Sequence, residues 1–206
     1  MGGKRSDLRR RAAIRDPVPR FTIFCEGRNT EPTYLRALRH RLPKVLLRLE
    51  PGAGVPYTLA QKAVERARED RRRVDSYEKR DEIWAVFDRD EHPRYEEAAD
   101  LCRRHNIGVA RSNPCFELWL ILHLSDYDRS DDRHQLQRHL RTLRPAYDPD
   151  GAKTLDCNEL LDTLDKAETR AETQLARRAE EGVPHGPPST TMGALIRAWR
   201  KAAGDG

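Results

Sequence analysis

Short apolar runs alternate along the first 124 residues with stretches that carry apolar side chains every three or four positions. The runs predict buried strands at residues 21–25, 45–49, 82–87 and 107–110. The helical spacing between them predicts helices at residues 31–42, 58–73, 93–105 and 115–124. Alternating strands and helices are typical of an α/β fold with a mostly parallel sheet flanked by helices.

The pattern changes after residue 124, where no further strand is expected. Helices are predicted at residues 133–143, 155–181 and 191–202, with loops at 144–153 and 182–188. We therefore expect three parts in the chain. They are a basic flexible arm (1–20), an α/β core (21–124) and a helical C-terminal extension packed on the core (125–206).

Composition narrows the class of protein. Charged residues make up 35% of the 206 residues and hydrophobic residues 37%, and the mean hydropathy is −0.88. No apolar run approaches the roughly 20 residues that a membrane-spanning helix needs, which excludes a membrane protein. The four cysteines show neither C-x-x-C nor zinc-finger spacing, and Cys25 and Cys115 stand in or beside apolar runs. We expect free thiols in a reducing, cytoplasmic compartment.

The net charge of +5 is concentrated at the N-terminus. Residues 1–20 hold seven Lys or Arg and two Asp, and seven minus two equals the net charge of the whole chain. This arm includes Arg9, Arg10 and Arg11, and no apolar segment of a secretory signal follows it. Two interpretations are open: a solvated tail, or an arm that contacts nucleic-acid phosphates.

Acidic residues directly follow two of the predicted strands. Glu26 follows the strand at 21–25, and Asp88 and Asp90 follow the strand at 82–87. Ligands of open α/β sheets collect at the carboxyl ends of the strands, so neighbouring strands would bring these three carboxylates together. Such crowding favours a hard divalent cation, Mg²⁺ or Mn²⁺, with oxygen ligands. The alternative is that Asp88 and Asp90 only shape a turn or cap a helix.

Glu117 is a charged residue in the otherwise apolar helix predicted at 115–124. One interpretation is a first-turn glutamate that interacts favourably with the helix dipole. The other places Glu117 among the carboxylates of the metal site. His123, in the same helix, has no metal-binding partner one turn away and is expected to be structural. No phosphate-binding loop, dinucleotide-binding motif or nucleophile elbow occurs in the sequence.

Four blocks of the sequence together resemble the RloB-like family, whose core resembles the Toprim fold. The blocks are Cys25-Glu26-Gly27 with Thr30-Glu31-Pro32 and Tyr34-Leu35, Val86-Phe87-Asp88-Arg89-Asp90 with His92, Ser112-Asn113-Pro114-Cys115-Phe116-Glu117-Leu118-Trp119, and the weaker Pro188-Ser189-Thr190-Thr191. The resemblance implies a Toprim-like sheet. It also implies that Glu26 is a general acid/base or a metal ligand, and that Asp88 and Asp90 are metal ligands.

The resemblance also implies an activity. Members of that family resemble components of phage-defence loci, and some are paired with an AAA- or ABC-type ATPase, as in abortive-infection pairs. The implied protein is a metal-dependent nuclease-like effector that cleaves RNA, tRNA included, or DNA. In such a reaction a metal ion polarises a phosphoryl oxygen and activates water. Arg28, Arg89 or Lys153 would stabilise the developing charge, and His92 would extend the polar cluster toward the nucleic acid.

A second class of function stays open at this point. The high charge and the long helical extension also suit a non-catalytic, Toprim-like module that binds nucleic acid or an ATPase and lets the partner act. No base-reading motif is present, so neither RNA nor DNA is favoured. The sequence predicts neither the oligomeric state nor the event that would trigger the protein.

Overall fold

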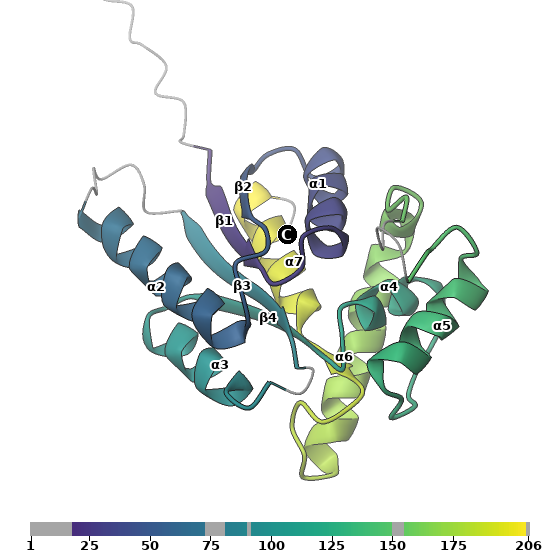
Figure 1. Ribbon diagram of the computed structural model, residues 1–206. Coiled ribbons are helices and arrows are strands. Elements are labelled where there is room, and N and C mark those ends of the chain that lie inside the picture. The colour runs from purple at the N-terminus through teal and green to yellow at the C-terminus, as the bar shows by residue number, and fades with distance from the viewer. Residues whose placement is uncertain (1–17, 73–80, 90–91, 150–154, 205–206) are drawn as a thin grey trace, which may run out of the picture.

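The computed structural model describes residues 18–72, 81–89, 92–149 and 155–204. Five strands form one sheet in the order β2-β1-β3-β4-β5 (Figure 1). The strands are β1 (Arg20–Cys25), β2 (Leu46–Glu50), β3 (Glu82–Asp88), β4 (Gly108–Asn113) and β5 (Ser189–Thr190). The first four are parallel, and β5 pairs antiparallel with β4. The predicted α/β fold with a mostly parallel sheet is confirmed.

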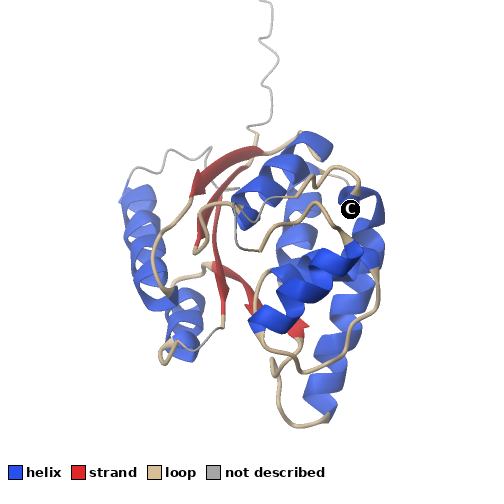
Figure 2. Cartoon of the chain, turned by 45° about the vertical axis from the view of Figure 1, so that its right-hand side comes forward, coloured by secondary structure: helices blue, strands red, loops and turns tan. Residues whose placement is uncertain are grey.

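Seven α-helices lie within the described residues. They are α1 (Thr30–Arg41), α2 (Pro56–Arg72), α3 (Tyr95–Arg104), α4 (Glu117–Leu124), α5 (Arg133–Leu143), α6 (Leu164–Glu180) and α7 (Met192–Ala203), and a 3₁₀ turn, η1 (Leu160–Thr163), precedes α6. Helices α2 and α3 pack side by side on one face of the sheet, and the other helices lie on its opposite side (Figures 1 and 2). The predicted flanking helices and helical C-terminal extension are confirmed.

Alternate residues of the central strands face two separate hydrophobic cores. In β1, Phe21 and Ile23 belong to the core shared with α1 and α4–α7, whereas Phe24 belongs to the core under α2 and α3. In β3, Val86 belongs to the first of these cores and Phe87 belongs to the second. This follows from the two-residue period of a strand, and it explains why strands buried on both faces are apolar throughout.

Helix α4 anchors the C-terminal part of the chain to the sheet. Its residues from Glu117 to His123 are all buried, as expected for a helix that is apolar on every side and enclosed by protein. His123 is 1% exposed; its Nδ1 donates to the Leu160 carbonyl at 2.7 Å, and its Nε2 accepts from the Tyr34 hydroxyl at 3.0 Å. The expected structural role of His123 is therefore confirmed.

Three expectations about the elements were wrong. A strand does occur after residue 124, because Ser189 and Thr190 form β5, which is too short to show a periodic pattern. Strand β4 continues to Asn113, and there Ser112 hydrogen-bonds to the Thr190 hydroxyl at 2.9 Å. The helix predicted at 155–181 begins only with η1 and α6, because the side chain of Asp156 accepts the backbone N–H of Asn158 and holds a turn there.

The state of the cysteines agrees with the expectation of free thiols. All four cysteines are buried and free, and burial raises the pKa of each thiol. Across the described ranges, no helix combines the length and the apolar character that a bilayer crossing requires.

Candidate functional site

Glu26 and Asp88 meet at the carboxyl edge of the sheet. Strands β1 and β3 are neighbours, with Cys25 opposite Val86, so the residues that follow them lie at the same edge. The backbone N–H of Asp88 donates to Glu26 Oε2 at 3.2 Å. The structure thus brings together two of the three carboxylates that the sequence placed at this edge.

His92 contacts the other oxygen of the same carboxylate. Its Nε2 lies 3.1 Å from Glu26 Oε1, and both side chains are partly buried. Glu26 is therefore held on both sides, by the Asp88 amide on Oε2 and by the His92 ring on Oε1. A carboxylate fixed in this way keeps one orientation toward the space in front of the sheet.

Several predicted site residues lie outside the described residues. They are Asp90, Lys153 and the arm residues Arg9, Arg10 and Arg11. Their expected roles as metal ligand, transition-state cation and phosphate contacts remain predictions.

Four carboxylates from four elements of the fold line one cavity of about 320 Å³. Glu26 and Asp88 come from the ends of β1 and β3, Glu31 comes from the first turn of α1, and Glu117 comes from the start of α4. The exposed Arg28 and the partly buried Arg133 line the same cavity. This is a mostly anionic pocket with two cations at its border.

Glu31 is one of the site residues that the sequence did not reveal. It is 4% exposed, and its Oε1 accepts the backbone N–H of Gly27 at 2.9 Å. The pKa of Glu31 is raised to about 7, chiefly by burial, with two backbone hydrogen bonds lowering it and the nearby charges of Glu117 and Glu26 raising it. A glutamate in the first turn of a helix usually interacts with the helix dipole, which hides an inward orientation from the sequence.

Glu117 both begins α4 and forms part of the cavity wall, so the two interpretations of it are compatible. It is 4% exposed. Its Oε1 accepts two hydrogen bonds, from the Tyr147 hydroxyl at 2.6 Å and from Gln137 Nε2 at 3.1 Å. Two neutral donors therefore hold this buried carboxylate in place. No sequence pattern indicates Tyr147 or Gln137 at the site, because they follow Glu117 by 30 and 20 residues.

A second cavity of about 780 Å³ adjoins the first. Glu26 and Arg133 line both cavities, and His92, Asn113, Pro114, Asp132 and His134 complete the second. Helix α5 starts at Arg133, where Asp132 and Gln135 form a capping box, each side chain bonding the backbone of the other. The helical extension therefore supplies one wall of the site, with positively charged or titratable groups. Of the two remaining predicted cations, Arg28 borders the first cavity, and Arg89 is exposed one residue beyond β3.

The described side chains alone do not form a complete metal site. Among them, no group of three or more His, Cys, Asp or Glu residues is placed to hold a metal ion. The predicted third ligand, Asp90, lies outside the described residues. The donor types nevertheless fit Mg²⁺ or Mn²⁺, because the cavity presents carboxylate oxygens and crowds negative charge around Glu31.

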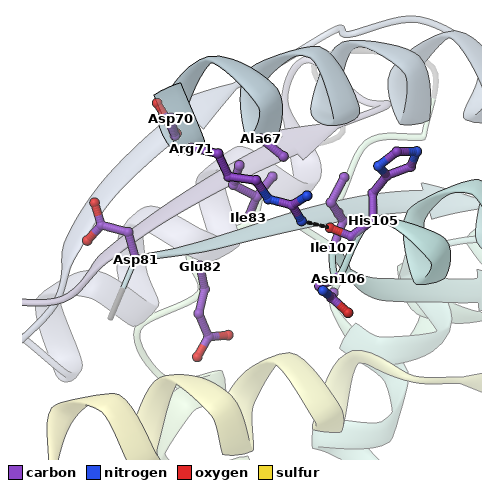
Figure 3. Close-up of a pocket in the computed structure, with 10 residues that line it drawn as sticks. Ala67, Asp70, Arg71, Asp81, Glu82, Ile83, His105, Asn106 and Ile107 are labelled. Carbon is purple, nitrogen blue, oxygen red and sulfur yellow. Dashed lines mark hydrogen bonds between the residues drawn. The ribbon is translucent and has the colours of Figure 1, made fainter. Parts of the chain in front are cut away.

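A further cavity of about 330 Å³ lies at the opposite edge of the sheet (Figure 3). It lies between the last turns of α2 and α3 and the first residues of β3 and β4, and Arg71 donates to the His105 carbonyl across it at 2.9 Å. Its acidic residues have structural partners: Asp70 pairs with Arg66, and Asp81 accepts the backbone N–H of Arg20. This cavity is therefore part of the framework rather than of the site.

Comparison with known proteins gives one match. No curated protein and no solved structure matches the chain. The family model described as "RloB-like protein" matches residues 21–198, which include every element from β1 to most of α7 and every residue of both cavities. The chain belongs to the RloB-like family.

Proposed function

We propose that this protein is a metal-dependent nuclease-like enzyme that hydrolyses phosphodiesters of RNA, tRNA included, or DNA as the cytoplasmic effector of a phage-defence system. The observation that carries the proposal is the convergence of Glu26, Glu31, Asp88 and Glu117 on one cavity at the carboxyl edge of the sheet. So many carboxylates in one half-buried space are costly without a cation, and a divalent cation is what allows a phosphate to approach them.

Glu26, Asp88 and Asp90 would hold the ion, and Glu31 and Glu117 face the same cavity. A bound Mg²⁺ or Mn²⁺ supplies Lewis-acid polarisation of a phosphoryl oxygen. The chain itself supplies the groups around it. In the alternative in which Asp88 and Asp90 alone hold the ion, Glu26, oriented by the Asp88 amide and by His92, would accept a proton from the attacking water.

The cations at the border of the site would stabilise the charge that develops on the phosphate. Arg28 and Arg133 line the acidic cavity, and the exposed Arg89 follows Asp88 directly. Lys153 and the basic arm are further candidates, the arm adding salt-dependent affinity for a phosphate backbone. The proposed partners are a nucleic acid and an AAA- or ABC-type ATPase, as the family resemblance implies.

A cleavage assay tests the proposal. Purified protein, with and without a candidate ATPase, is incubated with labelled tRNA, single-stranded DNA and duplex DNA in Mg²⁺ or Mn²⁺. We expect Asp88→Ala and Asp90→Ala to lower cleavage by about 100-fold or more. The matched control is Asp70→Ala, which removes an acid from the cavity at the opposite edge and should leave cleavage unchanged. Cleavage that persists undiminished in both site variants contradicts the proposal.

The second candidate is a non-catalytic module that binds nucleic acid or an ATPase. It is favoured by the finding that the described side chains contain no three-ligand metal group. Salt-dependent binding that EDTA leaves unchanged, without turnover of any of the three substrates, would support this alternative. Loss of all binding on chelation would count against it.

A further inference from the structure

Tyr57 and Arg94 form a stacked pair that lines neither of the two cavities of the site. The guanidinium carbon of Arg94 lies over the face of the Tyr57 ring, 3.3 Å from its centroid. That separation is well within the range of a cation–π contact. The pair joins the start of α2 to the turn that leads into α3.

Glu97 fixes the Arg94 guanidinium in its own plane. Both Nε and Nη2 of Arg94 donate to Glu97 Oε2, at 3.0 and 2.8 Å. The Arg94 side chain is nevertheless 51% exposed. Tyr57 therefore lies under the guanidinium and Glu97 pairs with one edge of it, while about half of the Arg94 side chain stays exposed. A flat cation held by two neighbours thus remains accessible to a ligand.

The stacked pair lies at the same edge of the sheet as the site. Tyr57 is the second residue of α2, which follows β2, and Arg94 stands in the segment that follows β3. A single residue, Pro93, separates Arg94 from His92, whose ring contacts Glu26 and lines the second cavity. The Cα atoms of two residues so placed lie at most about 7 Å apart, so the backbone at Arg94 follows closely on the wall of the second cavity.

A planar, accessible guanidinium close to the proposed phosphate-processing site suits one class of ligand. Nucleobases stack on arginine planes and on aromatic rings, and only unpaired bases have a free face to offer. We propose that Arg94 and Tyr57 form a stacking platform for an unpaired nucleobase, so that the preferred substrate is a single-stranded segment of nucleic acid. The proposal rests on the proposed function in one respect, namely that the ligand is a nucleic acid.

The competing explanation is that the pair only connects α2 to α3. The substitution Arg94→Lys distinguishes the stacking platform from this structural role. Lysine keeps the positive charge and can pair with Glu97, but it has no planar group. Arg103, in the last turn of the same helix α3, provides the matched control. It forms an exposed ion pair with Asp100, which precedes it by three residues. Arg94→Lys and Arg103→Lys therefore make the same chemical change in similar surroundings.

The experiment measures binding in Ca²⁺, which takes oxygen ligands as Mg²⁺ does, and gel analysis of the recovered strands verifies that they stay intact. The probes are a short single-stranded oligonucleotide, an abasic oligonucleotide with the same number of phosphates, and a duplex, each followed by fluorescence anisotropy. We expect the wild type to bind the base-bearing strand about 5- to 150-fold more tightly than the abasic strand. Arg94→Lys should bring that ratio close to one while leaving the affinity for the abasic strand unchanged, and Arg103→Lys should keep the wild-type ratio.

Two further variants, both at position 57, distinguish loss of stacking from loss of folding. Tyr57→Phe retains the ring and should retain the ratio, whereas Tyr57→Leu retains apolar packing and should lose it. The platform is overturned if the wild type binds base-bearing and abasic strands equally, if it binds neither, or if Arg94→Lys keeps the wild-type ratio. Failure of the platform proposal and failure of the nuclease proposal give different results. Cleavage without base preference contradicts the platform alone, and base preference without cleavage contradicts the nuclease alone.

Discussion

The backbone N–H of Gly27 donates to Glu31 Oε1 at 2.9 Å, and the Glu31 carboxylate occupies the space that a Cβ at position 27 would need. The glycine after Glu26 is thus required by a side chain rather than by a positive φ. It allows Glu31 to lie against the loop between β1 and α1, where it joins Glu26 in the acidic cavity. Glycine at position 27 therefore leaves room for the Glu31 carboxylate beside this loop.

Gly27→Ala tests this contact directly. The added methyl group overlaps the Glu31 carboxylate, so we expect the free energy of unfolding to fall by about 1–3 kcal/mol, measured by urea denaturation. In a Glu31→Ala background the same substitution should cost much less, because the carboxylate is gone. Equal costs in the two backgrounds would show that the overlap with Glu31 is not the reason for the glycine.

Glu31→Gln should change how stability depends on pH. Burial raises the pKa of Glu31 from 4.5 to about 7 in the folded protein, so the folded state binds the proton more tightly than the unfolded state. The stability linked to this proton is present below pH 4.5 and is lost as the pH rises to about 7. The amide stays neutral and still accepts from Gly27. We therefore expect Glu31→Gln to be more stable than the wild type above pH 7, on the order of 3 kcal/mol, and equal to it at pH 4. A constant difference across this range would contradict the prediction.

His123 should produce a slope of the opposite sign. Burial lowers its pKa from 6.5 to about 4, so the unfolded state takes up the proton first as the pH falls. The stability linked to His123 is present above pH 6.5 and is lost as the pH falls toward 4, on the order of 3 kcal/mol.

His123→Gln removes this loss while Glu31 still favours low pH, so the urea midpoint of this variant should decline more with rising pH than that of the wild type. The wild type, in which the two effects oppose each other between pH 4.5 and 6.5, should show a flatter profile. Identical profiles for His123→Gln and the wild type would contradict the assignment.

Tyr147→Phe should loosen Glu117. The hydroxyl donates to the buried carboxylate at 2.6 Å, and hydrogen bonds to charged groups contribute about 1.5–3 kcal/mol. We expect a loss of that size in the free energy of unfolding. Tyr127→Phe is the comparison, since its hydroxyl donates to the more accessible Asp131 and should cost less. An equal or smaller loss for Tyr147→Phe would mean that Gln137 alone holds Glu117.

The sequence predicted the elements in which apolar residues recur with a regular period. Buried strands and amphipathic helices extend over many residues, so their pattern is visible, and helix α5 has the predicted bounds, Arg133–Leu143. Strand β5 was missed because two residues show no period. Its position depends on hydrogen bonds to Arg111 and Ser112, which precede it by about 80 residues in the chain.

The candidate site was predictable only where it follows strands. Glu26 and Asp88 each directly follow an apolar run, which is visible in the sequence. The parallel pairing of β1 with β3 then brings the two residues together. Glu31 and Arg133 have no such signal. Whether a side chain on the first turn of a helix points into a cavity depends on how that helix packs, and no short stretch of sequence contains this information.

The proposed function requires a divalent cation in the cavity at the carboxyl edge of the sheet, and Mn²⁺ makes such an ion visible. Crystals of the full chain soaked in Mn²⁺ are examined for anomalous scattering at the manganese edge. We expect a peak between Glu26 and Asp88, about 2.1 Å from a carboxylate oxygen, and we expect this peak to disappear in Asp88→Ala. No peak in that cavity, or a peak that Asp88→Ala leaves unchanged, would contradict the proposed function.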